Sequence, residues 1–269
     1  MPRVSVVMSV YEGVPSLILE KAIASILGQT FRDFEFVITA DGPLTTRQQM
    51  IVEQAMKSDN RVKVVWNDRR MGPGYAANCG VAVSCGELIA RMDADDMSLP
   101  ERLGRQVSFL DEHQDIELVG TFAYEIDKED RIVFAKRLPT MANELRSFLA
   151  WRDPFIHPTL MFRRRFFDRL GTYKTNLRVN IEDTELECRA FSAGVAGANI
   201  GEFLYMFRVD EQFMARRRGR IYATEEAGLR WRYVRDMHMP TRYYLCPILI
   251  FLMRLSPEWL LRYLYRFAR

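Results

Sequence analysis

The chain has 269 residues, of which 48% are hydrophobic and 27% are charged, which supplies a substantial core and excludes a wholly disordered protein. Four cysteines without Cys-x-x-Cys spacing and only three histidines argue against a zinc site. The net charge of +3 hides an asymmetry, because residues 1–210 carry 26 basic and 30 acidic side chains whereas residues 211–269 carry 12 and 5. A basic tail on an acidic body indicates a separate anionic partner for the tail, either nucleic acid or a membrane surface.

Runs rich in β-branched and aromatic residues begin near positions 4, 34, 62 and 87, and helix-compatible segments lie between them at about 16–27, 44–58 and 74–84. This alternation is the pattern of βαβ units in a parallel sheet. Residues 116–137 add two predicted strands around a polar turn at 127–130, and the pattern from residue 214 onward is helical and basic.

The residues that follow each of the four early strands are polar or glycine. In open parallel sheets, ligands bind at the carboxyl ends of the strands. Any one of these segments is equally typical of an ordinary turn, but four at one edge favour a ligand site. The residues concerned are Ser9, Tyr11 and Glu12, then Asp41 and Gly42, then Asn67 and Asp68, and finally Asp93, Asp95 and Asp96.

Three carboxylates follow the fourth strand within four residues: Asp93, Asp95 and Asp96. Such close carboxylates repel one another unless a cation holds them, and hard oxygen ligands suit Mg²⁺ or Mn²⁺ together with substrate phosphates. The alternative is an acidic loop ahead of the helix predicted to begin near Pro100.

In chain order, these motifs resemble the family 2 glycosyltransferases, which are inverting enzymes of the GT-A fold, and among them the bacterial O-antigen, capsule and exopolysaccharide transferases. The resemblance covers about residues 3–210. It is carried by residues 4–11, 25–31, 41–42, 72, 76–78, 92–96, 157–159 and 182–183. It implies an α/β fold with a mostly parallel, Rossmann-like central sheet flanked by helices, and a C-terminal helical extension.

The resemblance also divides the chain. It implies a catalytic domain over 1–210, with a nucleotide-sugar-binding half at 1–115 and an acceptor-binding half at 116–210 that holds the catalytic base. Residues 211–269 form the basic amphipathic helical region.

Roles for the donor side follow from the resemblance. Asp95 matches the metal-contacting aspartate, Asp93 serves ribose or metal, and Asp96 is a third candidate ligand for Mn²⁺ or Mg²⁺. The positions that match the nucleoside site are Ser9, Tyr11, Glu12 and Asp41. The resemblance also implies that Arg69 and Asn78 contact the base or a phosphate. The alternative is that Arg69 is a solvated charge and Asn78 an ordinary helix residue.

On the acceptor side, Asp183 matches the general base of an inverting transfer, which takes the proton of the attacking hydroxyl. Glu182 orients it or binds the acceptor. The residues alone are equally compatible with a helix start, with Asn180 as N-cap and acidic side chains in the first turn. His157 is a metal ligand, an acceptor contact or a hydrogen-bonded core histidine.

The chain departs from the family pattern beside Asp41. Ala40 stands where relatives carry an acidic residue that bonds the base, and Pro43 replaces a serine. The base contact is therefore in doubt or passes to Asp41, although a UDP-sugar remains favoured over a GDP- or dTDP-sugar.

Residues 241–269 combine leucines, aromatics and arginines. The apolar run 245–253 is shorter than the roughly 18–20 residues that span a bilayer. Ser256 and Pro257 predict the start of a last helix that lies in a membrane interface, or alternatively packs on the catalytic domain.

The sequence therefore predicts an inverting, metal-dependent hexosyltransferase that moves a sugar from a nucleotide-sugar to a glycan or lipid-linked glycan in bacterial surface polysaccharide biosynthesis. It is predicted to act as a peripheral protein at the cytoplasmic face of the inner membrane, without a nucleic-acid partner. The alternatives are a sugar-phosphate nucleotidyltransferase and a non-catalytic, membrane-associated scaffold with a relict nucleotide site.

Overall fold

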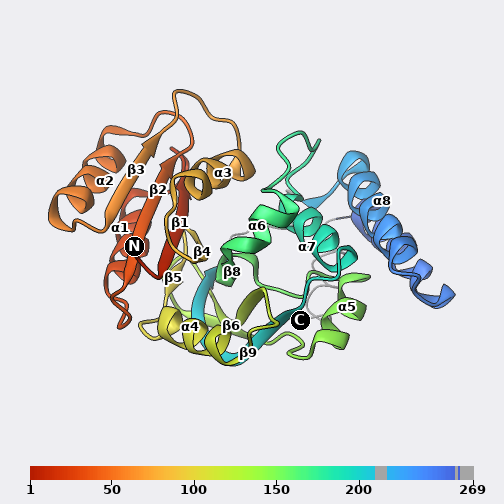
Figure 1. Ribbon diagram of the computed structural model, residues 1–269. Coiled ribbons are helices and arrows are strands. Elements are labelled where there is room, and N and C mark those ends of the chain that lie inside the picture. The colour runs from red at the N-terminus through yellow and green to blue at the C-terminus, as the bar shows by residue number, and fades with distance from the viewer. Residues whose placement is uncertain (210–216, 258–259, 261–269) are drawn as a thin grey trace.

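The computed structural model describes residues 1–209, 217–257 and 260. Within them, one mixed sheet has the strand order β3-β2-β1-β4-β8-β6-β9-β5, and β7 pairs with β6 (Figure 1). The strands are β1 (Val4–Val10), β2 (Phe34–Ala40), β3 (Val62–Trp66), β4 (Leu88–Asp93), β5 (Met97–Ser98), β6 (Leu118–Ile126), β7 (Ile132–Lys136), β8 (Met161–Arg163) and β9 (Gly197–Arg208).

The first four strands to pair, β3, β2, β1 and β4, are parallel, as the βαβ pattern predicted. Beyond β4 the sheet is mixed, because β8 runs antiparallel to both of its neighbours, β4 and β6. The β6–β7 hairpin has the predicted strands on either side of its polar turn. The predicted mostly parallel sheet is thus found in β1–β4, and β6 and β9 add a further parallel pair within the mixed part.

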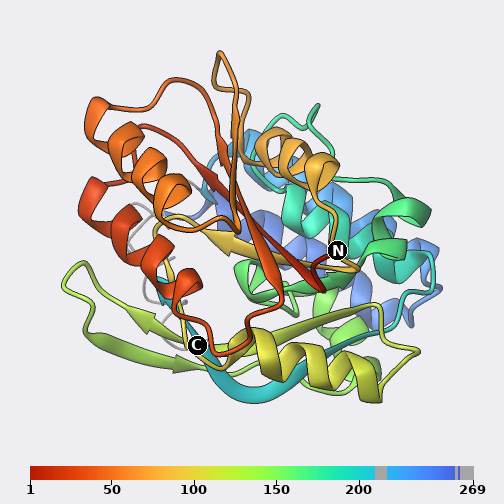
Figure 2. The same ribbon diagram turned by 60° about the vertical axis from the view of Figure 1, so that its left-hand side comes forward.

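Helices cover both faces of the parallel strands (Figure 2). The helices α1 (Ser16–Leu27) and α2 (Thr46–Ser58) pack on one face and α3 (Pro73–Val83) packs on the other. A Cβ at Gly80 of α3 would lie 2.5 Å from Val7 Cγ1, so glycine permits this close approach. The predicted helix segments are confirmed, with shifts of one or two residues at their ends.

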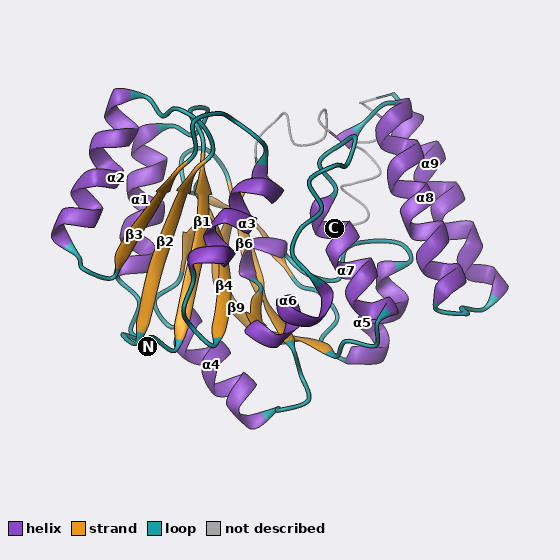
Figure 3. Ribbon diagram, turned by 45° about the horizontal axis from the view of Figure 1, so that its top comes forward, coloured by secondary structure: helices purple, strands orange, loops and turns teal. Residues whose placement is uncertain are grey.

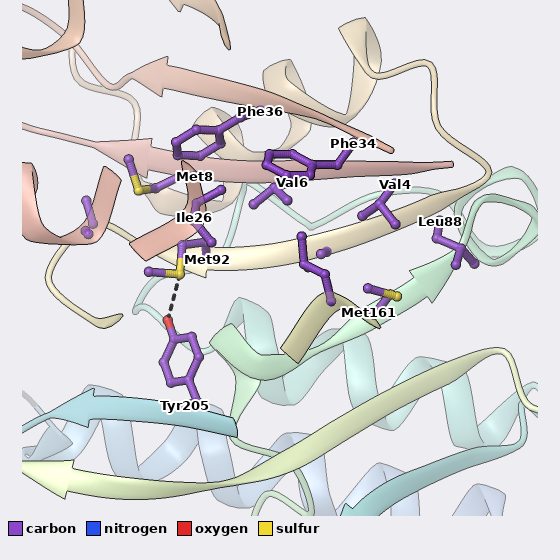
Figure 4. Packing of buried hydrophobic residues seen from close by; sticks show 14 of the residues in the cluster. Val4, Val6, Met8, Ile26, Phe34, Phe36, Leu88, Met92, Met161 and Tyr205 are labelled. Atoms are coloured by element: carbon purple, nitrogen blue, oxygen red, sulfur yellow. Dashed lines mark hydrogen bonds between the residues drawn. The ribbon is translucent and has the colours of Figure 1, made fainter. Parts of the chain in front are cut away.

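Alternate side chains of β1 enter two separate cores, as expected for a strand covered on both faces. Val4, Val6 and Met8 pack with the α1 side (Figure 4). Val7 packs with the α3 side. The first core extends to β9, where the Tyr205 hydroxyl donates to Met92 Sδ at 3.4 Å. The end of β4 is therefore held on two sides by buried packing.

The remaining helices lie on the second half of the sheet and beside it. They are α4 (Arg102–Glu112), α5 (Ala142–Leu149), α6 (Arg164–Leu170), α7 (Glu182–Ser192), α8 (Arg220–Asp236) and α9 (Leu245–Leu255), with short 3₁₀ turns at His157–Thr159 and Thr241–Tyr244. The helices α8 and α9 lie side by side, and α8 packs on α7 (Figure 3).

The helical C-terminal region is confirmed as far as α9. In the described part of the chain, no helix is both long and apolar enough to cross a membrane. Ser256, which was predicted to begin the last helix, is the C-cap residue that follows α9. Most of the last predicted helix lies outside the described residues.

Candidate functional site

A cavity of about 1380 Å³ opens between the carboxyl end of β4, the start of α7 and the α8–α9 pair. Its lining includes Asp93, Asp95 and Asp96 from one half of the chain and Glu182 and Asp183 from the other. The two sets of carboxylates that the sequence singled out therefore face one cavity.

The acidic cluster is defined here as Asp93, Asp95 and Asp96. One ligand oxygen from each carboxylate lies within 4.8 Å of the others. Asp96 is 1% exposed, and its Oδ1 accepts the Arg208 backbone N–H at 2.7 Å. Its Oδ2 is buried without a hydrogen-bond partner among the described residues. A buried carboxylate oxygen without a hydrogen-bond partner, beside two further carboxylates, is a suitable ligand atom for a hard cation.

The electrostatics of the acidic cluster agree with this geometry. Burial raises the pKa of Asp96 well above its usual range, and the charges of Asp95 and Asp93 raise it further. Burial also raises the pKa of Asp93, against the opposing charges of Arg91 and Arg102. A divalent cation would relieve this excess of negative charge, so the residues present fit one.

Two arginines that the sequence reasoning passed over shape the acidic cluster. Arg208, at the end of β9, donates its Nε to the Asp95 carbonyl at 2.8 Å and also bonds Asp130. Arg91 is buried in β4, 3.4 Å from Asp93 Oδ1, and lines the cavity. A charged residue inside an apolar strand run was the signal for Arg91, whereas nothing in the local sequence marked Arg208.

The second set of carboxylates begins α7. Its first turn contains Glu182, Asp183 and Glu185. The predicted N-cap at Asn180 is wrong, because Ile181, whose side chain has no hydrogen-bonding group, occupies that position. Asp183 instead satisfies one of the free backbone N–H groups at the helix start, because its Oδ1 accepts the Thr184 N–H at 2.8 Å. Asp183 is thereby fixed at the end of a helix while it lines the cavity.

The pKa values of this pair suit proton transfer. Burial raises the pKa of Asp183 to about 6, with the charge of Asp153 adding to the rise and those of Arg217 and Arg230 opposing it. Burial, and then the charge of Asp183, raise the pKa of Glu182 to about 7. A general base is most effective when its pKa is near the working pH, and Asp183 remains mostly ionised at pH 7.

His157 lines the same cavity but is not in the acidic cluster. Its Nε2 is 2.9 Å from the Tyr173 hydroxyl, and its Nδ1 is 3.4 Å from Glu187 Oε1. Burial, together with the nearby charge of Arg91, lowers the pKa of His157 to about 3, so the ring is neutral at pH 7. Both ring nitrogens are thus occupied by protein partners, which fits the hydrogen-bonded core histidine among the three readings.

The predicted nucleoside residues lie outside the described lining of the cavity, and the Tyr11 and Glu12 carbonyls accept the side-chain amide of Gln48 in α2. Ser9 Oγ is buried without a partner among the described residues, and Glu12 is exposed. The Arg70 guanidinium lies 4.2 Å above the Tyr11 ring. A buried hydroxyl without a hydrogen-bond partner and a cation–π pair are compatible with a nucleoside at this place.

Other predicted donor-side residues have structural partners. Asp41 is buried, and its oxygens accept the Met71 N–H at 2.7 Å and the Gly72 N–H at 3.0 Å, so it orders the loop that carries the exposed Arg69. Both ends of the Asn78 amide bond the Tyr173 backbone, at 2.8 and 2.9 Å. Asn78 therefore connects α3 to the loop before α7.

The model of the family described as glycosyl transferase family 2 matches residues 5–171. The chain belongs to this family. It is 30% identical over 245 residues to the putative glycosyltransferase EpsE of Bacillus subtilis (strain 168), covering 91% of this chain and 86% of the relative. It is 25% identical over 268 residues to the UDP-Gal:alpha-D-GlcNAc-diphosphoundecaprenol beta-1,3-galactosyltransferase of Escherichia coli, covering 98% and 96%.

Solved structures share the fold of this glycosyltransferase. The mannosyltransferase PcManGT of Pyrobaculum calidifontis, in complex with GDP-Man and Mn²⁺, superposes with a TM-score of 0.66 at 18% identity, over 91% of this chain and 68% of that one. S. aureus TarS 1-349, in complex with UDP-GlcNAc, gives 0.63 at 17% identity over 94% and 82%, and this chain spans 43% of the longer TarS structure. The predicted GT-A fold is confirmed.

Proposed function

We propose that this glycosyltransferase moves a sugar from a nucleotide-sugar donor to a hydroxyl of a glycan or lipid-linked glycan, with inversion at the anomeric carbon. The observation that supports this most is the single cavity that holds both the acidic cluster and the Glu182–Asp183 pair. Inverting transfer needs both parts: charge compensation for the leaving diphosphate, and a base for the acceptor.

On the donor side, Asp93, Asp95 and Asp96 would hold a Mn²⁺ or Mg²⁺ ion. When bound, such an ion supplies Lewis-acid stabilisation to the diphosphate as it leaves. The chain keeps the three carboxylates converged by burying Asp96 and tying the loop to Arg208.

On the acceptor side, Asp183 accepts the proton of the acceptor hydroxyl. The acceptor oxygen forms a bond to the anomeric carbon, and the bond from that carbon to the diphosphate breaks, leaving its electron pair on the nucleoside diphosphate. Glu182 lies beside Asp183 and orients the acceptor.

The donor is proposed to be a UDP-sugar. The Escherichia coli relative is named for the donor UDP-Gal, and TarS is solved with UDP-GlcNAc, whereas PcManGT is solved with GDP-Man. Ala40 offers the base no hydrogen-bonding side chain, and the oxygens of Asp41 already accept the Met71 and Gly72 N–H groups.

The acceptor is proposed to be lipid-linked, in bacterial surface polysaccharide synthesis, with residues 211–269 beside the catalytic domain 1–210 and residues 241–269 on the cytoplasmic membrane face. The helix α9 presents exposed apolar side chains at helical spacing: Leu245, Ile248, Leu249, Leu252 and Leu255. Residues 217–257 carry eight arginines and three acidic residues. An apolar stripe among arginines suits an anionic bilayer surface.

The donor proposal is tested by thermal unfolding with UDP-galactose, UDP-glucose, UDP-N-acetylglucosamine and GDP-mannose, each with Mn²⁺ or with EDTA. A donor at 100 times its Kd should add about 2.7 kcal/mol of stability in Mn²⁺. Membrane lipid extract is then added as acceptor and the products are identified. Release of nucleoside diphosphate supports glycosyl transfer, and binding without turnover indicates the scaffold. A separate incubation with UTP and sugar 1-phosphates tests the nucleotidyltransferase, which would form a UDP-sugar and release pyrophosphate.

The membrane proposal is tested by sedimentation with phosphatidylglycerol and phosphatidylcholine vesicles. The unchanged protein should bind the anionic vesicles, and the pair Leu245→Glu and Ile248→Glu, at exposed α9 positions outside the cavity lining, should lose at least about tenfold of that binding. Met50→Glu, at an exposed position on α2, is the matched control and should bind normally. Equal binding by all three proteins contradicts a role for α9.

A further inference from the structure

A buried ion network joins the C-terminal helices to the body of the enzyme. Arg230 of α8 is 1% exposed, and its guanidinium donates to Asp153 Oδ1 at 2.7 Å and to Glu226 Oε1 at 3.3 Å. Glu226 in turn accepts the Arg254 Nε of α9 at 2.6 Å. Two helices, α8 and α9, and the loop that carries Asp153 are thus connected by charges, of which those of Arg230 and Glu226 are buried and that of Asp153 is half-buried.

The ion network continues to the start of α7. The Thr184 hydroxyl donates to Asp153 Oδ1 at 2.9 Å, the same oxygen that Arg230 binds. The backbone N–H of Thr184 donates to Asp183 Oδ1 at 2.8 Å. One residue of α7 therefore connects the Asp153–Arg230 ion pair to the carboxylate that faces the cavity.

The charges around Asp183 agree with a functional connection. Burial would raise the pKa of Asp153, but the charges of Arg230 and Arg217 outweigh it and hold that pKa at about 2, so Asp153 stays ionised. Its fixed charge adds to the rise in the pKa of Asp183, after burial, and Arg230 opposes it. The charged and titratable groups that act on Asp183 or are affected by it are Asp153, Tyr173, Glu182, Glu187, Arg217, Tyr222 and Arg230.

We propose that Asp153 and Arg230 are positioning residues for Asp183, which hold the base in place through Thr184. The inference rests on the proposed function in one respect, namely that Asp183 is the base. It assigns to α8 a part in the acceptor chemistry, in addition to the packing of a C-terminal extension.

The competing explanation is a purely structural ion pair that fastens α8 to the body. Both explanations predict lower stability when the pair is broken. They differ in the proton affinity of Asp183, because only a positioning pair changes it, and in opposite directions for its two members. Loss of the Asp153 charge should ease ionisation of Asp183, and loss of the Arg230 charge should hinder it.

The test uses the full chain labelled with aspartate ¹³C at the side-chain carboxyl. The Asp183 signal is assigned by its disappearance in Asp183→Asn and is titrated by NMR, which needs no substrate. Asp153→Asn should lower the Asp183 midpoint by about one pH unit, and Arg230→Gln should raise it by a similar amount. Arg230→Lys keeps the charge and should restore a midpoint near that of the unchanged protein.

Glu185→Gln is the matched control. Glu185 is buried on the same helix and pairs with Arg189 at 3.0 Å and Lys174 at 2.8 Å, but it is not among the main contributions to the pKa of Asp183. It should lose stability without moving the Asp183 midpoint. A midpoint that stays constant in Asp153→Asn, or that moves equally in Glu185→Gln, overturns the proposal. If Arg230→Gln does not fold, Asp153→Asn and Arg230→Lys still decide it.

Turnover separates this inference from the proposed function. The pH dependence of nucleoside diphosphate release is measured with the best donor of the thermal screen and membrane lipid extract, and its acid limb should follow the NMR midpoints. If Asp183→Asn releases product normally, the assignment of the base fails. If Asp183→Asn is inactive while Asp153→Asn keeps the original acid limb, only the positioning role fails.

Discussion

The acidic cluster and the Asp153–Arg230 ion pair, which line the same cavity, differ in how their negative charge is compensated. In the acidic cluster, Asp96 has a buried oxygen without a hydrogen-bond partner in the described part of the chain, and its pKa is raised well above its usual range. Around α7, the chain supplies its own buried cation, so that Asp153 has a pKa of about 2. An acidic group that lacks a full internal counter-charge is suited to a cation from solution, whereas one paired internally is suited to hold a base in a fixed state.

The largest expected effects come from removing one carboxylate of the acidic cluster or of the Glu182–Asp183 pair. Asp95→Asn and Asp183→Asn should each lower transfer by at least ~10²-fold, since one loses metal charge compensation and the other the base. Donor binding should separate them, because only Asp95→Asn should lose the Mn²⁺-dependent thermal stabilisation. Transfer within about tenfold of normal in both variants contradicts the whole assignment.

Stability should change in opposite directions at the acidic cluster and at the Asp153–Arg230 ion pair. Arg230→Met leaves the buried Glu226 and the half-buried Asp153 with reduced compensation and should lower the free energy of unfolding by about 3–5 kcal/mol. Asp96→Asn removes an undercompensated charge and should raise the free energy of unfolding of the metal-free protein by about 1 kcal/mol. Urea unfolding in EDTA measures both, and a loss of stability in Asp96→Asn would show that the cluster is already balanced.

Activity should fall on the acid side. Asp183 must be ionised to accept a proton, and its pKa of about 6 means that the active form is lost as the pH falls through 6. At pH 5 the rate should be about tenfold below its plateau. Rates of nucleoside diphosphate release from pH 4.5 to 9 measure this, and Glu182→Gln should keep an acid limb. A flat profile would remove Asp183 as the base.

The smallest effect is expected at a carboxylate that serves neither purpose. The carboxylate oxygens of Asp41 accept hydrogen bonds from the Met71 and Gly72 N–H groups. Asp41→Asn should weaken donor binding by roughly three- to tenfold, because a charged acceptor of hydrogen bonds becomes neutral and the loop loosens. Calorimetric titration of the selected donor measures the loss. A loss above about 100-fold would instead indicate direct contact of Asp41 with the nucleotide.

The parts of the site that are continuous in sequence could be predicted. The acidic cluster follows a recognisable strand, and Glu182 and Asp183 are adjacent. The βαβ order of β1–β4 also predicted which strand ends meet, because parallel strands place them at one edge.

The parts formed by distant residues could not be predicted in the same way. Asp153 and Arg230 are far apart in the chain, and each alone is typical of a solvated charge. The Asn78 amide could form hydrogen bonds with a ligand or with the Tyr173 backbone. Only the packing of α3 shows that Tyr173 is its partner. The antiparallel insertion of β8 likewise depends on long-range pairing, which periodicity does not encode.

The Asp153–Arg230 ion pair has a consequence for attempts to shorten or recombine this enzyme. The family model ends at residue 171, and the resemblance in sequence ends near 210, so both would place α8 outside the minimal unit. A chain cut at 210 would nevertheless lose Arg230 and leave Asp153 and Asp183 facing each other without that cation. Chimeras that exchange acceptor specificity should therefore carry the segment around Asp153 and the helix around Arg230 from the same parent.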